Sequence, residues 1–436
     1  MRRFLMLGWL LCTGLGAFAQ DQLTFTSLDD VFAYAEAHSS TYKNASQQTL
    51  LAKYQTLAAQ LSKWNLKAEA NFTAIDNTKL PVNFLPAEIF GGQPGEFKTI
   101  TLGQQYVSTI STSPQFDILN PYAMGLVKVS RANEQLTRIT NQLNKKTLCE
   151  SIAASYYNIL SYKWQLLALQ ESLVNADSLT QIMQRKQVEG IARTQDVNNS
   201  LANQLAIKDR IQQLEILAAQ ETENLKLLCD IPAGAEVSVT AAQPSPVFDD
   251  NLTATNTLNK QQWEWQQKYR KADLEANKKW FLPTVSFISN VGWNQYSNNR
   301  FFDKTSWPGT NYVGLRFSVP LAPDVTKAAT VRYDRVYMRI NETNIAHAAL
   351  QDSVSNRQVV LDYKKAFTSY QLSSHIASLK KDSYQKNLDI YKEGILSATD
   401  LLISFNDWLN SSITTVAQLA TSEYDRSKIN INNTFK

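Results

Sequence analysis

Helix-breaking residues are almost missing from two long parts of this 436-residue sequence. No proline lies within residues 122–231 or 324–436, and the only glycines there are Gly125, Gly190 and Gly394. A proline inside a helix costs about 3 kcal/mol, and a glycine costs about 1 kcal/mol relative to alanine. The two stretches therefore predict two very long helical hairpins that turn at Gly190 and at Gly394. An arm from Leu126 to Gly190 would be about 100 Å long, which exceeds what a globular core can use.

Residues that carry out catalysis or bind metals are also scarce. The three histidines, His38, His347 and His375, are scattered and have no cluster of carboxylates or cysteines around them in the sequence. No glycine-rich phosphate-binding loop occurs either. We therefore expect no enzyme activity, no cofactor and no metal site. The formal net charge of +4 gives no indication of nucleic-acid binding.

Cysteine is rare, since only Cys149 and Cys229 follow Cys12. The two later cysteines lie at similar distances before and after Gly190, so antiparallel arms would bring them to about the same level. Helix axes pack about 8–10 Å apart, whereas a disulfide needs Cα atoms about 4.4–6.8 Å apart. We favour two buried small side chains over a bridge, and the bridge is the alternative.

Apolar runs long enough for a membrane helix are absent after the first residues. Arg2 and Arg3, an apolar run over residues 4–15 and the sequence Ala17-Phe18-Ala19 predict a secretory signal peptide over residues 1–19. Leu11 stands before Cys12 where a lipidated leader would have a small residue. If the mature chain crosses a membrane, we expect it to use strands.

A short motif occurs at both predicted hairpin turns. Residues 188–197 and 392–401 share Glu-Gly-Ile, and an aspartate follows six residues after each glycine, Asp196 and Asp400. Apolar residues in the second hairpin recur at the spacing of a coiled-coil seam, for example Leu401, Phe405, Leu409 and Val416. The repeated motif indicates two copies of one structural unit.

Four stretches alternate between apolar and polar residues, as β-strands do. They cover residues 66–76, 104–114, 283–293 and 311–320. Each has the length of a tilted membrane strand, about ten residues. Trp64 and Trp280 come just before the first strand of each pair, so we predict that they lie at a membrane–water interface, with a tryptophan in a helical core as the alternative. Pro114 and Pro320 are predicted to end the second strand of each pair.

The predicted fold is mainly α-helical with a membrane β-barrel. Residues 20–231 form the first repeat, residues 232–246 a linker, and residues 247–436 the second repeat. Each repeat reads helix, strand, strand and long helical hairpin. Four strands cannot close a barrel, and an open sheet edge is not tolerated in lipid. Several chains must therefore contribute. Two would supply about eight strands and three about twelve, and the wider barrel suits a conduit better because small barrels are filled with side chains.

With these elements in place, the sequence resembles the TolC-type outer-membrane efflux proteins over nearly the whole mature chain. The two Gly-Ile turns with their following aspartates are the most specific part of this resemblance. It implies a homotrimer in the bacterial outer membrane, with a twelve-stranded barrel and a helical tunnel of about 100 Å through the periplasm. It also implies docking onto a periplasmic adaptor (membrane fusion protein) and an inner-membrane pump, as in a tripartite efflux pump or a type I secretion system.

The resemblance also implies roles for individual residues. The adaptor contact would comprise Gly190, Ile191, Gly394 and Ile395. The pore constriction would comprise Asp400, Ile403, Tyr391 and Asp196. In the resemblance, Asp400 would form an aspartate ring, and Tyr391 and Asp196 fall where some members have a hydrogen-bonded latch between neighbouring hairpins. Two departures from the family pattern are present. Leu396 stands where the basic partner of that latch would lie, and Ile403 stands where a second aspartate ring would lie. A simpler role for Asp196 and Asp400 is to stabilise the first turns of the returning helices.

Two other functions share some of these features. A periplasmic adaptor also has a coiled-coil hairpin, but it would not need two hairpins and four amphipathic strands. A structural coiled-coil spacer would not need the alternating stretches. The exported substrate and the pump class do not follow from these residues.

Overall fold

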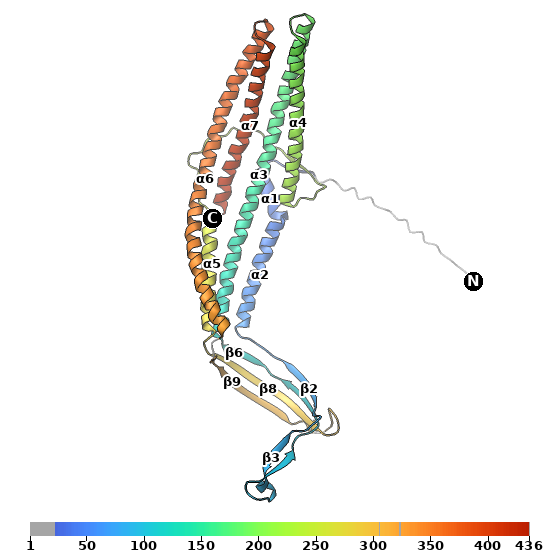
Figure 1. Cartoon of the computed structure of the whole chain (residues 1–436), viewed down its shortest axis with the longest axis vertical. Coiled ribbons are helices and arrows are strands. Elements are labelled where there is room, and N and C mark those ends of the chain that lie inside the picture. Colours follow the sequence, from blue (N-terminus) through green and yellow to red (C-terminus); the bar gives the residue numbers. More distant parts are fainter. Residues whose placement is uncertain (1–21, 305, 322–323, 436) are drawn as a thin grey trace, which may run out of the picture. The chain divides into compact units, whose positions relative to one another are not determined.

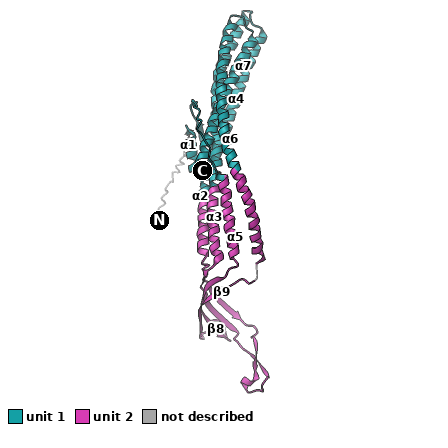
Figure 2. Ribbon diagram, turned by 90° about the vertical axis from the view of Figure 1, so that its left-hand side faces the viewer, with its two compact units in different colours: residues 1–46, 141–258, 350–436 teal, residues 47–140, 259–349 magenta. Residues whose placement is uncertain are grey.

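The computed structural model describes residues 22–304, 306–321 and 324–435. The predicted signal peptide 1–19, with Cys12, lies outside the described residues. The chain divides into two compact units (Figure 2). Unit 1 comprises residues 1–46, 141–258 and 350–436, and unit 2 comprises residues 47–140 and 259–349. Each unit therefore draws on both halves of the sequence, and the division into sequential repeats stays a prediction.

Two long helical hairpins are present, as the sequence predicts. Helices α3 (Pro121–Val188) and α6 (Val325–Lys392) have 68 residues each and are followed by α4 (Thr194–Cys229) and α7 (Ala398–Thr434) (Figure 1). Gly125 does not interrupt α3. Instead it allows a close approach to α5 (Leu258–Lys279), because a Cβ atom at residue 125 would lie 2.7 Å from the Cβ of Ala276.

The hairpins of unit 1 are held together by an apolar core. Leu401, Phe405 and Leu409, which the sequence placed on a seam, are all buried. Tyr384 of α6 stacks on Trp408 of α7 with ring centroids 5.2 Å apart. Full burial of one such side chain contributes about 1.5–3 kcal/mol. Packing of this seam, more than helix propensity, therefore stabilises the arms.

The N-terminal helix is divided into two, although no proline or glycine occurs in it. Helix α1 spans Leu28–His38 and α2 spans Ser40–Ser62, with Ser39 in an extended conformation. The N–H of Ser40 donates to the carboxylate of Asp230, at the end of α4. This long-range cap favours a new helix start at Ser40, which local sequence does not reveal.

The predicted linker is an ordered part of unit 1. Strand β7 (Glu236–Val239) pairs in parallel with β1 (Gln22–Phe25). The carbonyl of Val239 accepts a hydrogen bond from Lys163 Nζ at 2.6 Å, and the carbonyl of Ala241 accepts one from Trp164 Nε1 at 3.3 Å. These contacts fix the segment against α3.

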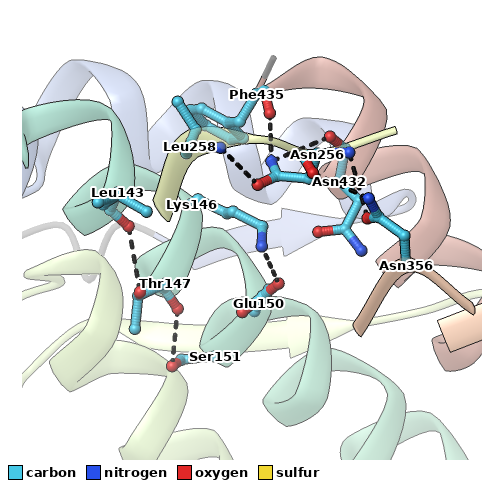
Figure 3. A network of polar contacts seen from close by, with 10 residues as sticks. All are labelled: Leu143, Lys146, Thr147, Glu150, Ser151, Asn256, Leu258, Asn356, Asn432 and Phe435. Carbon is cyan, nitrogen blue, oxygen red and sulfur yellow. Dashed lines mark hydrogen bonds and ion pairs between the residues drawn. The ribbon is translucent and has the colours of Figure 1, made fainter. Parts of the chain in front are cut away.

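An asparagine network anchors the chain just before α5 (Figure 3). The side-chain amide of Asn256 donates to the carbonyls of Asn432 and Phe435 near the end of α7. The side chain of Asn356 in α6 donates to the carbonyl of Asn256 at 2.8 Å and accepts from its N–H at 3.2 Å. The network therefore satisfies backbone groups that helix ends and loops leave open.

Unit 2 contains one larger sheet, and its strands are β2 (Ala70–Asp76), β5 (Tyr106–Thr112), β6 (Gln115–Leu119), β8 (Thr284–Ser297) and β9 (Gly309–Ser318). The order is β2-β5-β8-β6, and β9 pairs with β8 on the other side. All these pairs are antiparallel. Strand β8 therefore joins the strands from the first half of the sequence to β9.

Pro114 does not end the pairing with β8. Strand β6 follows it directly and pairs with β8 from Gln115 to Leu119. Proline has no N–H to donate, but its carbonyl still accepts a hydrogen bond from the N–H of Ser289 at 3.0 Å. Strand β5 itself does end at Thr112, two residues before Pro114, as predicted. A local signal cannot show that the partner strand β8 continues and pairs with the chain beyond the proline. Strand β9 ends at Ser318, two residues before Pro320.

A small hairpin lies between β2 and β5 in the sequence. It consists of β3 (Val82–Pro86), a 3-10 turn (Ala87–Phe90) and β4 (Phe97–Thr101). It forms a two-stranded sheet of its own. In the part of the chain that the structure describes, no helix carries an apolar stretch sufficient to span a membrane.

Candidate functional site

The first hairpin of unit 1 turns at a Schellman motif centred on Gly190. The N–H of Gly190 donates to the carbonyl of Gln187 at 2.9 Å, and the N–H of Ile191 donates to the carbonyl of Lys186 at 2.8 Å. Gly190 has a φ of +78°. Such a left-handed residue after a helix is favourable for glycine because it has no Cβ.

The second hairpin has the same turn. The N–H of Gly394 donates to the carbonyl of Tyr391 at 3.0 Å, and the N–H of Ile395 donates to the carbonyl of Ile390 at 3.2 Å. Gly394 has a φ of +83°. The repeated motif of the sequence therefore encodes one turn geometry at both tips.

The two turns expose an apolar side chain each. Ile191 is 63% exposed and Ile395 is 76% exposed. A Cβ atom added at Gly190 or Gly394 would meet no atom within 4 Å. The tips are thus open surfaces with a protruding isoleucine, and their role as an adaptor contact stays a prediction.

The aspartates of the motif cap the returning helices. The carboxylate of Asp196 accepts a hydrogen bond from the N–H of Arg193 at 3.0 Å. The N–H of Asp400 donates to Ser397 Oγ at 3.1 Å, and the Ser397 hydroxyl donates to the Asp400 carboxylate at 2.6 Å. Both aspartates therefore stabilise a helix N-terminus, the simpler role that the sequence allowed.

Asp400 and Ile403 lie on the exposed side of α7. Ile403 is 55% exposed, whereas Leu401 and Phe405 beside it are fully buried. The two residues are three positions apart, so they are neighbours on the helix surface. Their place at a pore constriction stays a prediction.

Tyr391 is buried between the hairpins of one chain, with 5% of its surface exposed. Its ring is covered by Lys186 Nζ at 4.7 Å from the centroid. Burial raises the pKa of Tyr391, and the nearby carboxylate of Asp196 raises it further. Tyr391 therefore belongs to an apolar core in this chain, and its part in the constriction stays a prediction.

Lys186 is a candidate functional residue that the sequence reading missed. Its Nζ donates to the carbonyl of Tyr391 at 2.7 Å and to the carbonyl of Lys392 at 3.1 Å. It thus connects the end of α3 to the end of α6. A cation at a helix C-terminus is stabilised by the unpaired carbonyls and the helix dipole. We call this set of contacts, with the Tyr391 ring, the Lys186 clamp.

The sheet of unit 2 has two different faces. The register places the apolar residues Phe72, Ile110, Trp293, Val313, Leu315 and Phe317 on one face. Leu315 is 70% exposed and Phe317 is 68% exposed. The other face carries polar pairs, for example Thr109 with Asn294 at 2.9 Å. Large exposed apolar surfaces of this kind mark a contact with lipid or with another protein.

Comparison with known proteins supports the same architecture. No protein-family model and no curated protein matches the sequence. Solved structures do match. The outer membrane channel CmeC of Campylobacter jejuni is 14% identical, with a TM-score of 0.74 over 93% of this chain and 85% of its own. The outer membrane protein VceC of Vibrio cholerae is 12% identical, with a TM-score of 0.70 over 93% of this chain and 95% of its own. CusC is 14% identical, with a TM-score of 0.75 over 96% of this chain and 95% of its own.

The chain has the fold of the TolC-type outer-membrane channels. The predicted fold class is thereby confirmed, including the pairing of long hairpins with a sheet. In this TolC-type fold, Trp64 and Trp280 each lie between a helix and a strand. Trp64 follows α2, is 48% exposed and lies under Lys63 Nζ at 5.2 Å. Trp280 follows α5 and packs edge-on against Phe281. Their membrane-interface role stays a prediction.

Among the described residues, Cys149 and Cys229 are both buried as free thiols. This confirms the preferred reading over the disulfide. Burial raises the pKa of the Cys149 thiol and raises that of Cys229 to about 12, so neither is a reactive thiolate at neutral pH. Among the described residues, no three histidine, cysteine or acidic side chains are grouped as a metal site would need.

Proposed function

We propose that this protein is the outer-membrane channel of a bacterial efflux system, with its sheet in the outer membrane and its helices in the periplasm. We further propose that it forms a homotrimer, which docks on a periplasmic adaptor and an inner-membrane pump. In that assembly it conducts substrates of a tripartite efflux pump or a type I secretion system.

The two-faced sheet carries this proposal. Strand β2 pairs only with β5, and β9 pairs only with β8, among the strands that the structure describes. Both outer strands therefore present unpaired backbone groups, which lipid does not tolerate. The apolar face suits lipid and the polar face suits a water-filled lumen. Further copies of the chain can satisfy all these requirements at once by pairing β2 of one copy with β9 of the next.

The helical tips supply the periplasmic part of the proposal. Ile191 and Ile395 protrude from equivalent turns and can enter apolar grooves of an adaptor. Asp400 and Ile403 are exposed on α7 and can face a common axis in the trimer. Three carboxylates around an axis would repel each other and attract cations, so we expect a small cation-selective conductance in the resting channel.

Charge placed on the apolar face tests the membrane assignment. Leu315→Lys puts a cation on the face assigned to lipid, where it costs about 2–4 kcal/mol near the bilayer midplane. Tyr312→Lys is the matched control, because Tyr312 lies on the same strand, is 52% exposed and points to the polar face. We expect the first variant to lose outer-membrane insertion and the second to retain it. Equal behaviour of both variants, or a wild type that never inserts, would favour the soluble adaptor or spacer.

Conductance in planar bilayers tests the channel itself. Wild type is compared with Asp400→Ala and with Asp407→Ala, whose carboxylate is already paired with Lys380 at 2.6 Å. We expect cation selectivity to fall in the Asp400 variant and to persist in the Asp407 variant. Unchanged selectivity in both would remove Asp400 from the constriction.

A further inference from the structure

The β3–β4 hairpin is the part of unit 2 with no assigned role. Its strands pair with each other over five residue pairs, from Val82 with Thr101 to Pro86 with Phe97. They form a sheet separate from the larger one. An isolated two-stranded hairpin is marginally stable in water. A packing partner would therefore supply stability that the hairpin lacks.

One face of this hairpin is apolar and open. The alternation of side chains puts Val82, Phe84 and Phe97 on the same face. Phe84 is 68% exposed and Phe97 is 67% exposed. At the tip, Ile89 is 67% exposed and Phe90 is 49% exposed. Such a cluster of exposed apolar side chains is typical of a contact surface.

The charges of the hairpin argue against an anionic lipid surface as its partner. Residues 77–104 contain Lys79 and Lys98 together with Glu88 and Glu96, so the segment has no net charge. Membrane-surface segments normally combine their apolar residues with an excess of lysine or arginine. An uncharged apolar face is better matched by another copy of itself.

The position of the hairpin in the sheet points to that second copy. In the sequence, the hairpin follows β2, which is an outer strand of the sheet, and precedes β5. Its base is held by hydrogen bonds from the N–H of Leu102 to the carbonyl of Pro81 at 3.2 Å and from the N–H of Asn77 to that of Gln105 at 2.8 Å. In each copy, the hairpin would therefore lie beside β2, the strand with which β9 of the neighbouring copy would pair.

The length of the hairpin is sufficient to close a channel mouth. A strand of five residues spans about 17 Å. A barrel of twelve tilted strands has a backbone radius of about 12 Å. Hairpins from three copies can therefore meet over the axis. Resting on the proposed trimeric channel, we propose that the β3–β4 hairpins pack against each other through Phe84 and Phe97 and form an apolar outer closure of the pore.

Conductance of the full-length channel in planar bilayers tests the closure. The double variant Phe84→Ser/Phe97→Ser is expected to raise the time-averaged conductance several-fold, because the packing face is lost. Lys98→Ser is the matched control, since Lys98 lies on the other face of the same strand, and it is expected to behave as wild type. Equal conductance of the double variant and wild type would overturn the proposal.

Cross-linking provides a readout that does not depend on conductance. Phe84→Cys is expected to form disulfide-linked copies under mild oxidation, whereas wild type, with Cys149 and Cys229 buried, is not. Quenching of a tryptophan at position 84 (Phe84→Trp) by brominated lipids, without cross-links, would instead assign the face to lipid and refute the closure. Failure of the proposed function is distinguishable, because wild type would then show neither insertion nor conductance.

Discussion

The Lys186 clamp predicts how firmly the two hairpin tips of one chain are held together. Lys186→Met retains the aliphatic stem and removes the ammonium group that reaches the carbonyls of Tyr391 and Lys392. Lys392→Met is the control, because the ammonium of Lys392 forms its salt bridge with the exposed Asp389 of its own helix, at 3.0 Å. The two variants thus remove the same charge from neighbouring positions.

The expected magnitude follows from the contacts. A cation on partly buried helix C-terminal carbonyls contributes up to about 2 kcal/mol, and its position over an aromatic ring adds about 0.5–1 kcal/mol at a partly exposed site. Solvent screening weakens both contributions, so we expect Lys186→Met to lower the local stability of the second tip by about 1–2 kcal/mol. This corresponds to an increase of about 5- to 30-fold in the local opening of the second tip. The exposed pair of Lys392 should contribute less than about 1 kcal/mol.

Amide hydrogen exchange at the second tip measures this opening. The N–H groups of Gly394 and Ile395 are hydrogen-bonded in the closed turn and should exchange faster in Lys186→Met. The N–H of Ile191 is an internal control, because it donates to the backbone carbonyl of Lys186, which the substitution leaves in place. If the proposed channel function holds, the same variant should also show a larger resting conductance.

The clamp would be refuted by one clear result. If Lys186→Met and Lys392→Met give the same exchange at Gly394 and Ile395, the ammonium contacts do not hold the tip. Faster amide exchange at both tips would instead show that the variant loosens both hairpins.

Further predictions concern Gly394, the partly buried carboxylate of Glu423 and the thiols. Gly394→Ala should destabilise the second turn by about 1–2 kcal/mol. Backbone strain alone would cause this, since φ at Gly394 is +83° and the space around it is empty. Gly234→Ala, also in open space, should not destabilise the protein, and urea unfolding of both variants checks this. Burial raises the pKa of Glu423, and Arg426 only partly opposes this. The carboxyl of Glu423 therefore keeps its proton to a higher pH in the folded state than in the unfolded chain. The free energy of unfolding falls as pH rises from the usual glutamate pKa through the raised one. Glu423→Gln should remove that part of the pH dependence in unfolding titrations, and parallel curves of unfolding free energy against pH for wild type and variant would contradict the prediction. Thiol titration should detect two groups after denaturation without reductant and none quickly before it, because Cys149 and Cys229 are buried and unbridged.

Local rules explain how much of this fold could be predicted. The lack of proline and glycine fixed the long arms, because helix breakers are costly wherever they occur. Gly190 and Gly394 could be identified as turns because the left-handed conformation after a helix favours glycine. The alternating stretches predicted strands, since side chains on a strand point to opposite faces in turn. Each of these signals acts over a few residues.

The missed features all depend on residues far apart in the chain. The helix start at Ser40 needs Asp230, the pairing beyond Pro114 needs β8, and the clamp joins Lys186 to a residue 205 positions later. The burial of Tyr391 likewise depends on packing between the two hairpins, which lie far apart in the sequence.

The sequence by itself therefore determined the helices, the strands and the two turns, because each is governed by the conformational preferences of neighbouring residues. The tertiary structure decided which strand joins which, which helix end receives the lysine, and which side chains of the tips stay exposed. These depend on distances between segments that no local pattern encodes.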